Sequence, residues 1–241
     1  MLADQGATPA QVGALDRDIH LPGEWLSNLV EFIASTLPGW RDDPRRPVET
    51  GETRLTAQLC AHLNGVTRRT TGWDFLQFKQ EEPDETDARR SIDLAVAPIG
   101  SIIWLESREY SHYETLLPIE CKRLPTPAGR SHDEREYLYS QFGSAGGVQR
   151  FKAGHHAAAH RRAAMIGYIQ DRDITFWKCQ LDQWVDALQA AGAPGWLEAD
   201  KLKLAEHNQT DRVGSLHSTH RRPTGMEPIL LDHIWIEMNH L

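Results

Sequence analysis

The sequence has little of what marks secreted, membrane and zinc-ribbon proteins. Its 241 residues include only three cysteines, Cys60, Cys121 and Cys179, which are widely separated and form no C-x-x-C pair. An odd number of cysteines, each in an apolar pattern, predicts reduced, buried thiols in a cytoplasmic protein. No run reaches the roughly 18 apolar residues of a membrane-spanning helix, which excludes such a helix. Residues 1–6 also lack the basic start and apolar stretch of a secretory signal.

Other missing patterns exclude several classes of enzyme and of repeat protein. The chain has no phosphate-loop glycine pattern, no dinucleotide fingerprint, no Ser-His-Asp arrangement, no internal repeat and no low-complexity tract. Its 40% hydrophobic and 25% charged residues are those of a globular protein with a substantial core.

A net charge of −8 is unfavourable for a nucleic-acid binder, but phosphate contacts depend on local charge. Arginine pairs recur at 68–69, 89–90, 161–162 and 221–222. Any one pair is readily explained as solvated surface charge. The pair Arg89–Arg90 has the strongest functional case, because it opens the strand that follows.

Two short segments predicted as strands organise the chain. Residues 91–97 read SIDLAVA and residues 117–123 read LPIECKR. Because side chains alternate along a strand, Asp93 lies opposite its apolar neighbours, and Glu120 and Lys122 share one face. If the strands pair, the three charges converge. The arrangement indicates either a divalent metal site or a buried structural ion-pair network.

Asp93, a gap and then Glu120-x-Lys122 in apolar strands resemble the PD-(D/E)xK nuclease superfamily, which includes many restriction endonucleases. The resemblance covers residues 50–170, and Ile92 stands where the named pattern has Pro. It implies that Asp93, Glu120 and Lys122 are catalytic. It also implies that Asp93 and Glu120 bind Mg²⁺, with Mn²⁺ as a substitute.

The same resemblance adds further metal ligands and substrate-binding residues to the expected site. It implies that the backbone carbonyl of Cys121 is a third metal ligand and that Glu52, in the first turn of a helix, completes the set. A first-turn acid that interacts only with the helix dipole is the alternative for Glu52. Gln149, with Arg150, is expected to bring substrate contacts from the helix after the Glu120 strand, and Arg90 is a further substrate-binding candidate.

The histidines of residues 154–160, GHHAAAH, form a separate pattern. His156 and His160 are four residues apart, which on a helix is compatible with zinc binding. Neither the glutamate that a metalloprotease needs nor a third ligand accompanies them. We therefore expect an exposed histidine cluster, or one near the phosphate backbone of a ligand.

The predicted fold is α/β: a restriction-endonuclease-like mixed sheet, with an antiparallel meander and a parallel crossover strand, flanked by helices. Helices are expected over residues 22–37, from 49 or 50 to 63, and around 181–188. Residues 137–160 are expected to be broadly helical, with interruptions at Gly143 and Gly146–Gly147. Residues 1–48 form an arm and helix, 49–192 the nuclease-like core, and 193–241 a strand-rich extension of the same domain.

Together these observations predict a Mg²⁺-dependent endonuclease that hydrolyses phosphodiester bonds, with DNA preferred to RNA. A bacterial or phage restriction or defence role, a cytoplasmic location and a homodimer or a defence partner protein follow from the resemblance alone. The alternative is a catalytically inactive nuclease-fold module that binds nucleic acid or regulates. No membrane partner is expected.

Overall fold

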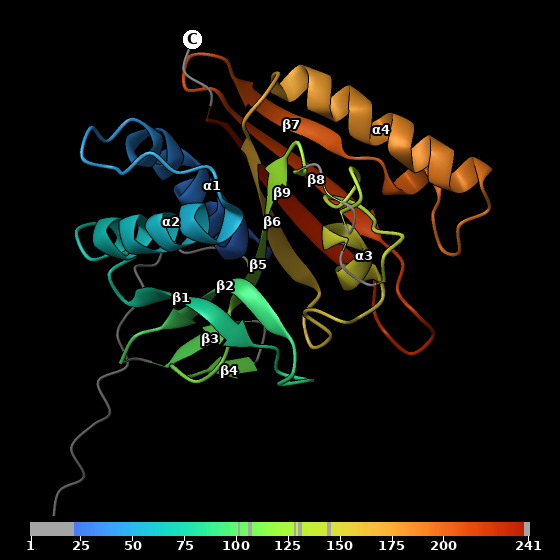
Figure 1. The fold of residues 1–241 in the computed structure, drawn as a ribbon. Coiled ribbons are helices and arrows are strands. Elements are labelled where there is room, and N and C mark those ends of the chain that lie inside the picture. The colour runs from blue at the N-terminus through green and yellow to red at the C-terminus, as the bar shows by residue number, and fades with distance from the viewer. Residues whose placement is uncertain are drawn as a thin grey trace, which may run out of the picture.

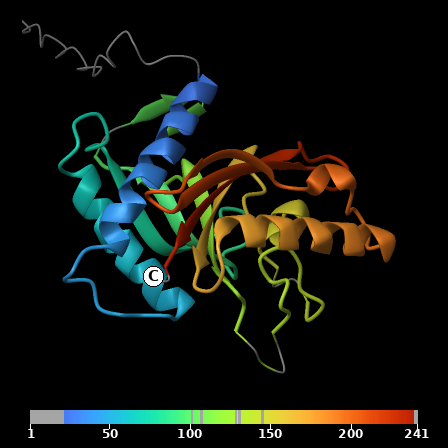
Figure 2. The same cartoon turned by 90° about the horizontal axis from the view of Figure 1, so that it is seen from above.

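The computed structural model describes residues 22–100, 102–105, 108–127, 129, 132–143 and 146–238. The arm predicted before residue 22 lies outside these residues. A seven-stranded sheet forms the centre, with helices on both of its faces (Figures 1 and 2). The chain is therefore α/β, as predicted.

The sheet is mixed, with strand order β1-β2-β5-β6-β9-β8-β7. In that order its strands are Leu76–Pro83, Ser91–Pro98, Leu117–Leu124, Arg162–Ile169, Ile229–Glu237, Val213–His220 and Lys203–Asn208. Strands β5, β6 and β9 are mutually parallel, and the other neighbouring pairs are antiparallel. A separate hairpin joins β3 (Ile103–Leu105) to β4 (Arg108–Tyr110).

The helices divide the core into two layers. α1 (Pro22–Arg41) and α2 (Glu52–Thr67) lie against one face of the sheet, and α3 (Gly147–Lys152) and α4 (Ile174–Ala190) lie against the other (Figure 2). A short 3₁₀ helix, η1 (Glu198–Asp200), follows α4. Alternation along the central strands explains the division: Ile119 and Cys121 of β5 face the α1–α2 core, and Leu124 contributes to the other.

The predicted meander and crossover are confirmed. β1, β2 and β5 are antiparallel neighbours, and the chain then returns through α3 to β6, which pairs parallel to β5. The strands predicted near the C-terminus continue this same sheet. β9 is an interior strand, parallel to β6 on one side and antiparallel to β8 on the other.

Both N-terminal helices run past their predicted ends. α1 continues through Pro38 to Arg41, because the buried side chains of Leu37 and Trp40 hold its last turn against the core. α2 passes Asn64, whose side chain does not end the helix. Its amide donates to the carbonyls of Cys60 and Phe78, and its oxygen accepts the Phe78 N–H, which ties α2 to β1.

The prediction of a broadly helical segment over residues 137–160 is wrong. Within its described residues only α3 is helical. The predicted interruption at Gly143 is confirmed, and Gly143 and Gly154, both with positive φ, exclude a longer helix on either side of α3. Gly146 also passes so close to Tyr139 that a Cβ would meet its backbone at 2.5 Å. The segment folds back on itself instead of extending.

The prediction of three buried cysteines holds for Cys60 and Cys121 but is wrong for Cys179, which lies exposed on α4.

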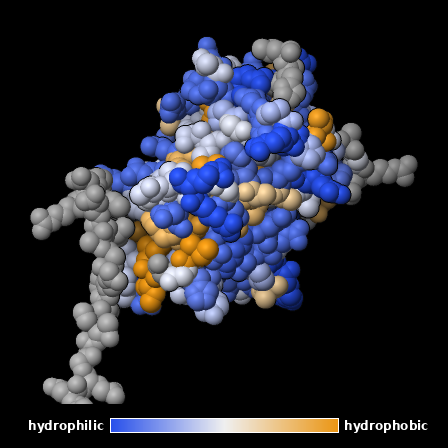
Figure 3. Space-filling model, turned by 90° about the vertical axis from the view of Figure 1, so that its left-hand side faces the viewer, coloured by the Kyte–Doolittle hydropathy of each residue, from blue (hydrophilic) through white to orange (hydrophobic). Residues whose placement is uncertain are grey.

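Within the described ranges, no helix has both the length and the apolar character to cross a bilayer. The face that carries α1 and α2 is largely hydrophilic, with an apolar area in its lower half (Figure 3).

Candidate active site

The site forms where β2 and β5 stop pairing. Their register joins residues 94–96 to 117–119 and ends before Asp93. The side chain of Asp93 then takes over, and its Oδ2 accepts the backbone N–H of Cys121 at 2.7 Å. A strand residue directs its N–H and C=O to the same neighbour, so the Cys121 carbonyl also faces the Asp93 side. The gap between the strands is thus lined by oxygen atoms.

Lys122 occupies the middle of this gap. Its Nζ lies 3.1 Å from Glu120 Oε1, 3.0 Å from Glu52 Oε1 and 4.0 Å from Asp93 Oδ2. The structure therefore brings together the three residues that the strand pattern placed on one face, and adds Glu52. We call these four residues the carboxylate–lysine cluster.

Glu52 reaches the cluster from the first turn of α2. Its second oxygen accepts the backbone N–H of Arg123 at 3.1 Å, so one carboxylate joins the start of α2 to β5. Leu55 and Leu59, which follow on the buried face, are fully buried and fix the orientation of the helix. The amphipathic pattern of α2 positions Glu52, and a role limited to the helix dipole does not account for these contacts.

Burial and charge set the protonation of the cluster. The Glu120 side chain is fully buried, which alone would raise its pKa. Lys122, His156 and Arg150 together outweigh that effect and hold the Glu120 pKa well below its usual range. Burial also disfavours the Lys122 cation, but the carboxylates of Glu120, Glu52 and Asp93 raise its pKa well above normal. In this arrangement Lys122 is a cation rather than a base.

Asp93 behaves differently from Glu120. Burial and the negative charge of Glu120 raise the pKa of Asp93 to about 7, against the opposing effects of Lys122 and the Cys121 amide. The cluster therefore carries more negative charge than its own cation balances. A further positive charge at this point would stabilise it.

The far side of Glu120 holds two residues of the segment after β5. Arg150, on α3, donates from Nη1 to Glu120 Oε1 at 2.7 Å. His156 Nδ1 lies 3.2 Å from Glu120 Oε2, although the two atoms do not align as a hydrogen bond.

The prediction of an exposed histidine cluster is wrong. His156 and His160 are only 3% and 6% exposed, and neither is in a helix. His160 Nε2 faces Glu85 Oε2 at 3.4 Å, so each histidine meets its own carboxylate rather than a shared zinc. The four-residue spacing does not predict these contacts, because it presumes a helix, and the positive φ of Ala157 between the two histidines is incompatible with one.

The remaining candidates have different surroundings. The side-chain oxygen of Gln149 accepts the backbone N–H of Ser140, so Gln149 supports the loop before α3. Arg90 donates from Nη1 to the His155 carbonyl at 3.3 Å and lies 3.5 Å from Asp87. Arg90 and Arg150 line the same polar pocket beside Glu120. Gln149 is not among the residues that line this pocket.

The resemblance implies Mg²⁺, and the residues of the cluster fit such an ion chemically. Glu52, Asp93, Glu120 and the Cys121 carbonyl offer the hard oxygen ligands that Mg²⁺ prefers. Glu120 Oε2 is buried without a hydrogen-bond partner, which suits an oxygen that binds a cation. Among the residues that the structure describes, however, no three Asp, Glu, His or Cys side chains are already arranged around a metal position. The Lys122 ammonium lies among the carboxylates, so metal binding requires it to shift.

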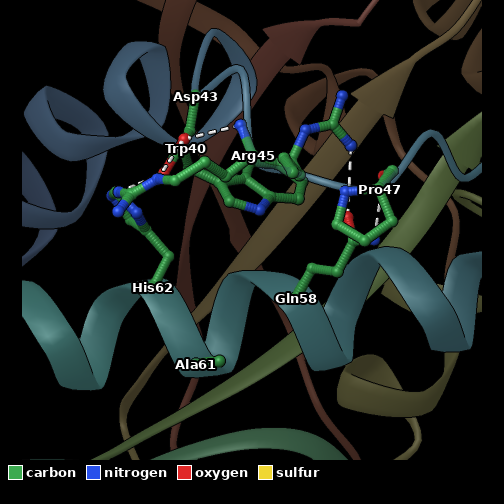
Figure 4. Close-up of a pocket in the computed structure, with 8 residues that line it drawn as sticks. Trp40, Asp43, Arg45, Pro47, Gln58, Ala61 and His62 are labelled. Carbon is green, nitrogen blue, oxygen red and sulfur yellow. Dashed lines mark hydrogen bonds and ion pairs between the residues drawn. The ribbon is translucent and has the colours of Figure 1, made fainter.

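A second pocket, of about 400 Å³, lies away from the cluster between the loop after α1 and the outer side of α2 (Figure 4). The indole of Trp40 forms its inner part, with the Arg46 guanidinium 5.2 Å from the ring centroid. Arg46 also donates to Gln58, and Gln58 donates to the Pro47 carbonyl. These contacts tie the loop to α2, and we assign the pocket no ligand.

No protein-family model, curated protein or solved structure matches this chain. The geometry of the carboxylate–lysine cluster is therefore the basis for assigning a function.

Proposed function

We propose that the chain is a metal-dependent nuclease of the PD-(D/E)xK kind that hydrolyses phosphodiester bonds, with DNA as the preferred substrate. The observation that carries the proposal is the convergence of Glu52, Asp93 and Glu120 on the ammonium of Lys122. Buried carboxylates are costly unless something balances them. A site that binds a cation and a scissile phosphate gives their gathering a chemical reason.

The topology supports a restriction-endonuclease-like core. The antiparallel β1-β2-β5 meander carries Asp93 and Glu120 on adjacent strands, and β6 follows as a parallel neighbour. α2 precedes the meander and supplies Glu52. This is the order of elements that the resemblance implies for residues 50–170.

Each residue has a distinct role in the proposed chemistry. Bound Mg²⁺ would activate water and polarise a phosphate oxygen. Glu120, Asp93 and Glu52 would hold the ion, and the Cys121 carbonyl would join them. Lys122, held as a cation, would then stabilise negative charge that develops on the phosphate. Its raised pKa favours this electrostatic role over proton abstraction.

The substrate would approach along the side of Glu120 that carries Arg150 and Arg90. Both guanidiniums line the pocket beside the cluster, where they can contact phosphate oxygens. The bacterial or phage defence setting, the cytoplasmic location and a homodimer or partner protein belong to the same proposal and have no support beyond the resemblance.

The proposal is tested by incubating the purified chain with plasmid, linear duplex, single-stranded DNA and RNA, with Mg²⁺, Mn²⁺ or EDTA. Cleavage is expected only with a divalent cation. Glu120→Gln and Lys122→Ala should abolish it, and Arg68→Ala, at an exposed position directly after α2, should not. Cleavage in EDTA, or full activity of the Glu120→Gln protein, would contradict the proposal.

One observation favours the inactive alternative. The Lys122 ammonium already balances part of the carboxylate charge without a metal. A nuclease fold that has lost activity and only binds nucleic acid could keep such an ion pair. This inactive alternative predicts that the chain binds DNA equally well with Mn²⁺ and with EDTA, and that it cuts none of the substrates tested.

A further inference from the structure

A polar pocket of about 260 Å³ opens beside Glu120. Two segments that lie far apart in the sequence form it: the start of β2 with the residues just before it, and α3 with the turn that follows. Its lining residues are Arg89, Arg90, Ser91, Arg150, His155 and His156. None of the six is acidic, so the wall of the pocket is basic although the whole chain is acidic.

Two guanidiniums of the pocket share a single acid. Arg89 and Arg90 share one carboxylate, that of Asp87, at 2.9 Å and 3.5 Å. Arg150 pairs with Glu120 and so joins the pocket to the carboxylate–lysine cluster. Guanidiniums present forked donors that match phosphate oxygens, so an anion would complete this set.

The surroundings of His155 also indicate that the pocket lacks a negatively charged group. Its Nδ1 is buried and has no hydrogen-bond partner. Burial and the nearby charges of Arg90, His156 and Arg150 lower its pKa. An anion in the pocket would offset these charges and give the imidazole an acceptor.

We propose that Arg89, Arg90, Arg150 and His155 form a phosphate-binding pocket that holds a phosphate group of the nucleic acid next to the one cleaved. The inference builds on the proposed function and names the group that the site recognises. Arg150 links the two positions, because it lines the pocket and also contacts Glu120. The phosphate can be an internal phosphodiester or the phosphate at a strand end.

The direct test is a calorimetric titration of the full chain with inorganic phosphate in EDTA at constant ionic strength. We expect saturable binding that Arg90→Met weakens at least tenfold and that Arg68→Met leaves unchanged. Arg89→Met, a change at an exposed side chain, should also weaken it and keeps the test valid if Arg90→Met does not fold. Equal binding by the Arg89→Met, Arg90→Met and Arg68→Met proteins, or no saturable binding, would overturn the inference.

A second test identifies the source of the phosphate by fluorescence anisotropy in EDTA, with oligonucleotides that carry 5′-phosphate, 3′-phosphate or only hydroxyl ends. Tighter binding of one phosphorylated end, lost in Arg90→Met, assigns the pocket to a strand end. Equal weakening of all three by Arg90→Met assigns it to an internal phosphodiester, and no effect on any of them contradicts the pocket. Neither test needs cleavage, so the inference can hold where the nuclease proposal fails.

Discussion

The carboxylate of Asp93 accepts the backbone N–H of Cys121 at 2.7 Å, in the place where a strand partner would otherwise stand. One side chain thus substitutes for the β2–β5 ladder and opens a gap lined by oxygen. Lys122 fills this gap, and Glu52 and Glu120 reach it from either side. The same local break in pairing satisfies the backbone and creates the candidate site.

The raised pKa of Asp93 predicts a pH-dependent stability in the absence of metal. Its folded pKa of about 7 lies above its ordinary value of 3.8. The stability linked to this group is therefore fully present below about pH 3.8 and is lost as the pH rises through 7. Asp93→Asn cannot ionise, so its free energy of unfolding at pH 8 should exceed that of the wild type. We expect a difference of only about 1–2 kcal/mol, because the side chain is 31% exposed and water screens its charge.

Urea unfolding of both proteins in EDTA at pH 5 and pH 8 measures this effect. The difference between them should grow with pH. A difference that is constant or shrinks shows that Asp93 ionises normally in the folded chain.

Lys122 should stabilise the fold because it balances three carboxylates. Lys122→Met leaves Glu120 fully buried without this partner, and we expect a loss of about 3 kcal/mol in the free energy of unfolding. Glu52→Gln removes one of the competing charges. The double variant should therefore lose less than the sum of the two single changes.

A double-mutant cycle in EDTA measures the coupling. Additive losses would mean that Glu52 and Lys122 do not interact in solution, although their atoms lie 3.0 Å apart here. Lys201→Met, which removes an ion pair with the exposed Asp186, is the matched control and should cost much less than Lys122→Met.

Glu85 makes the opposite pH prediction. Burial alone would raise its pKa, but His160, the Thr115 amide and Arg108 lower it to about 2. Its contribution to stability is then present above its ordinary value of 4.5 and is lost as the pH falls towards 2.

Glu85→Gln should cost about 1–2 kcal/mol at pH 7, since the side chain is 25% exposed, and progressively less below pH 4.5. Thermal unfolding from pH 7 to pH 3 follows the change. A cost that does not fall with pH would exclude the ionised carboxylate as its source.

A buried polar chain runs through the second core and should be sensitive to one hydroxyl. Ser218 Oγ lies 2.6 Å from His220 Nε2 and 2.7 Å from His233 Nε2, and His220 continues to Asp200. Ser218→Ala leaves two buried imidazole nitrogens without this partner, so we expect a loss of about 2–3 kcal/mol.

Ser215→Ala on the same strand, at a half-buried position, is the control. Chemical denaturation measures the free energy of unfolding of both variants, and Ser218→Ala should lose more than Ser215→Ala. Equal and small losses would mean that the imidazoles find other partners, such as each other or water.

The sequence predicts the parts of the site that depend on strand periodicity. Asp93, Glu120 and Lys122 follow from alternation along two apolar strands, and Glu52 from its place on the buried stripe of α2. The position of His156 beside Glu120 depends instead on the turn at Gly154, which no short-range pattern encodes. The apolar pattern around Cys179 wrongly predicts a buried thiol, because its apolar neighbours belong to a helix with one exposed face.

We propose that the carboxylate–lysine cluster cleaves phosphodiesters with a divalent cation. The most direct measurement is the single-turnover rate of cleavage of an end-labelled DNA duplex by the wild type and by Asp93→Asn, with Mn²⁺ and with EDTA. We expect the wild type to cleave with Mn²⁺ but not with EDTA, and Asp93→Asn to lose about a thousandfold or more of the Mn²⁺-dependent rate. Equal rates for the two proteins, or cleavage by the wild type in EDTA, would contradict it.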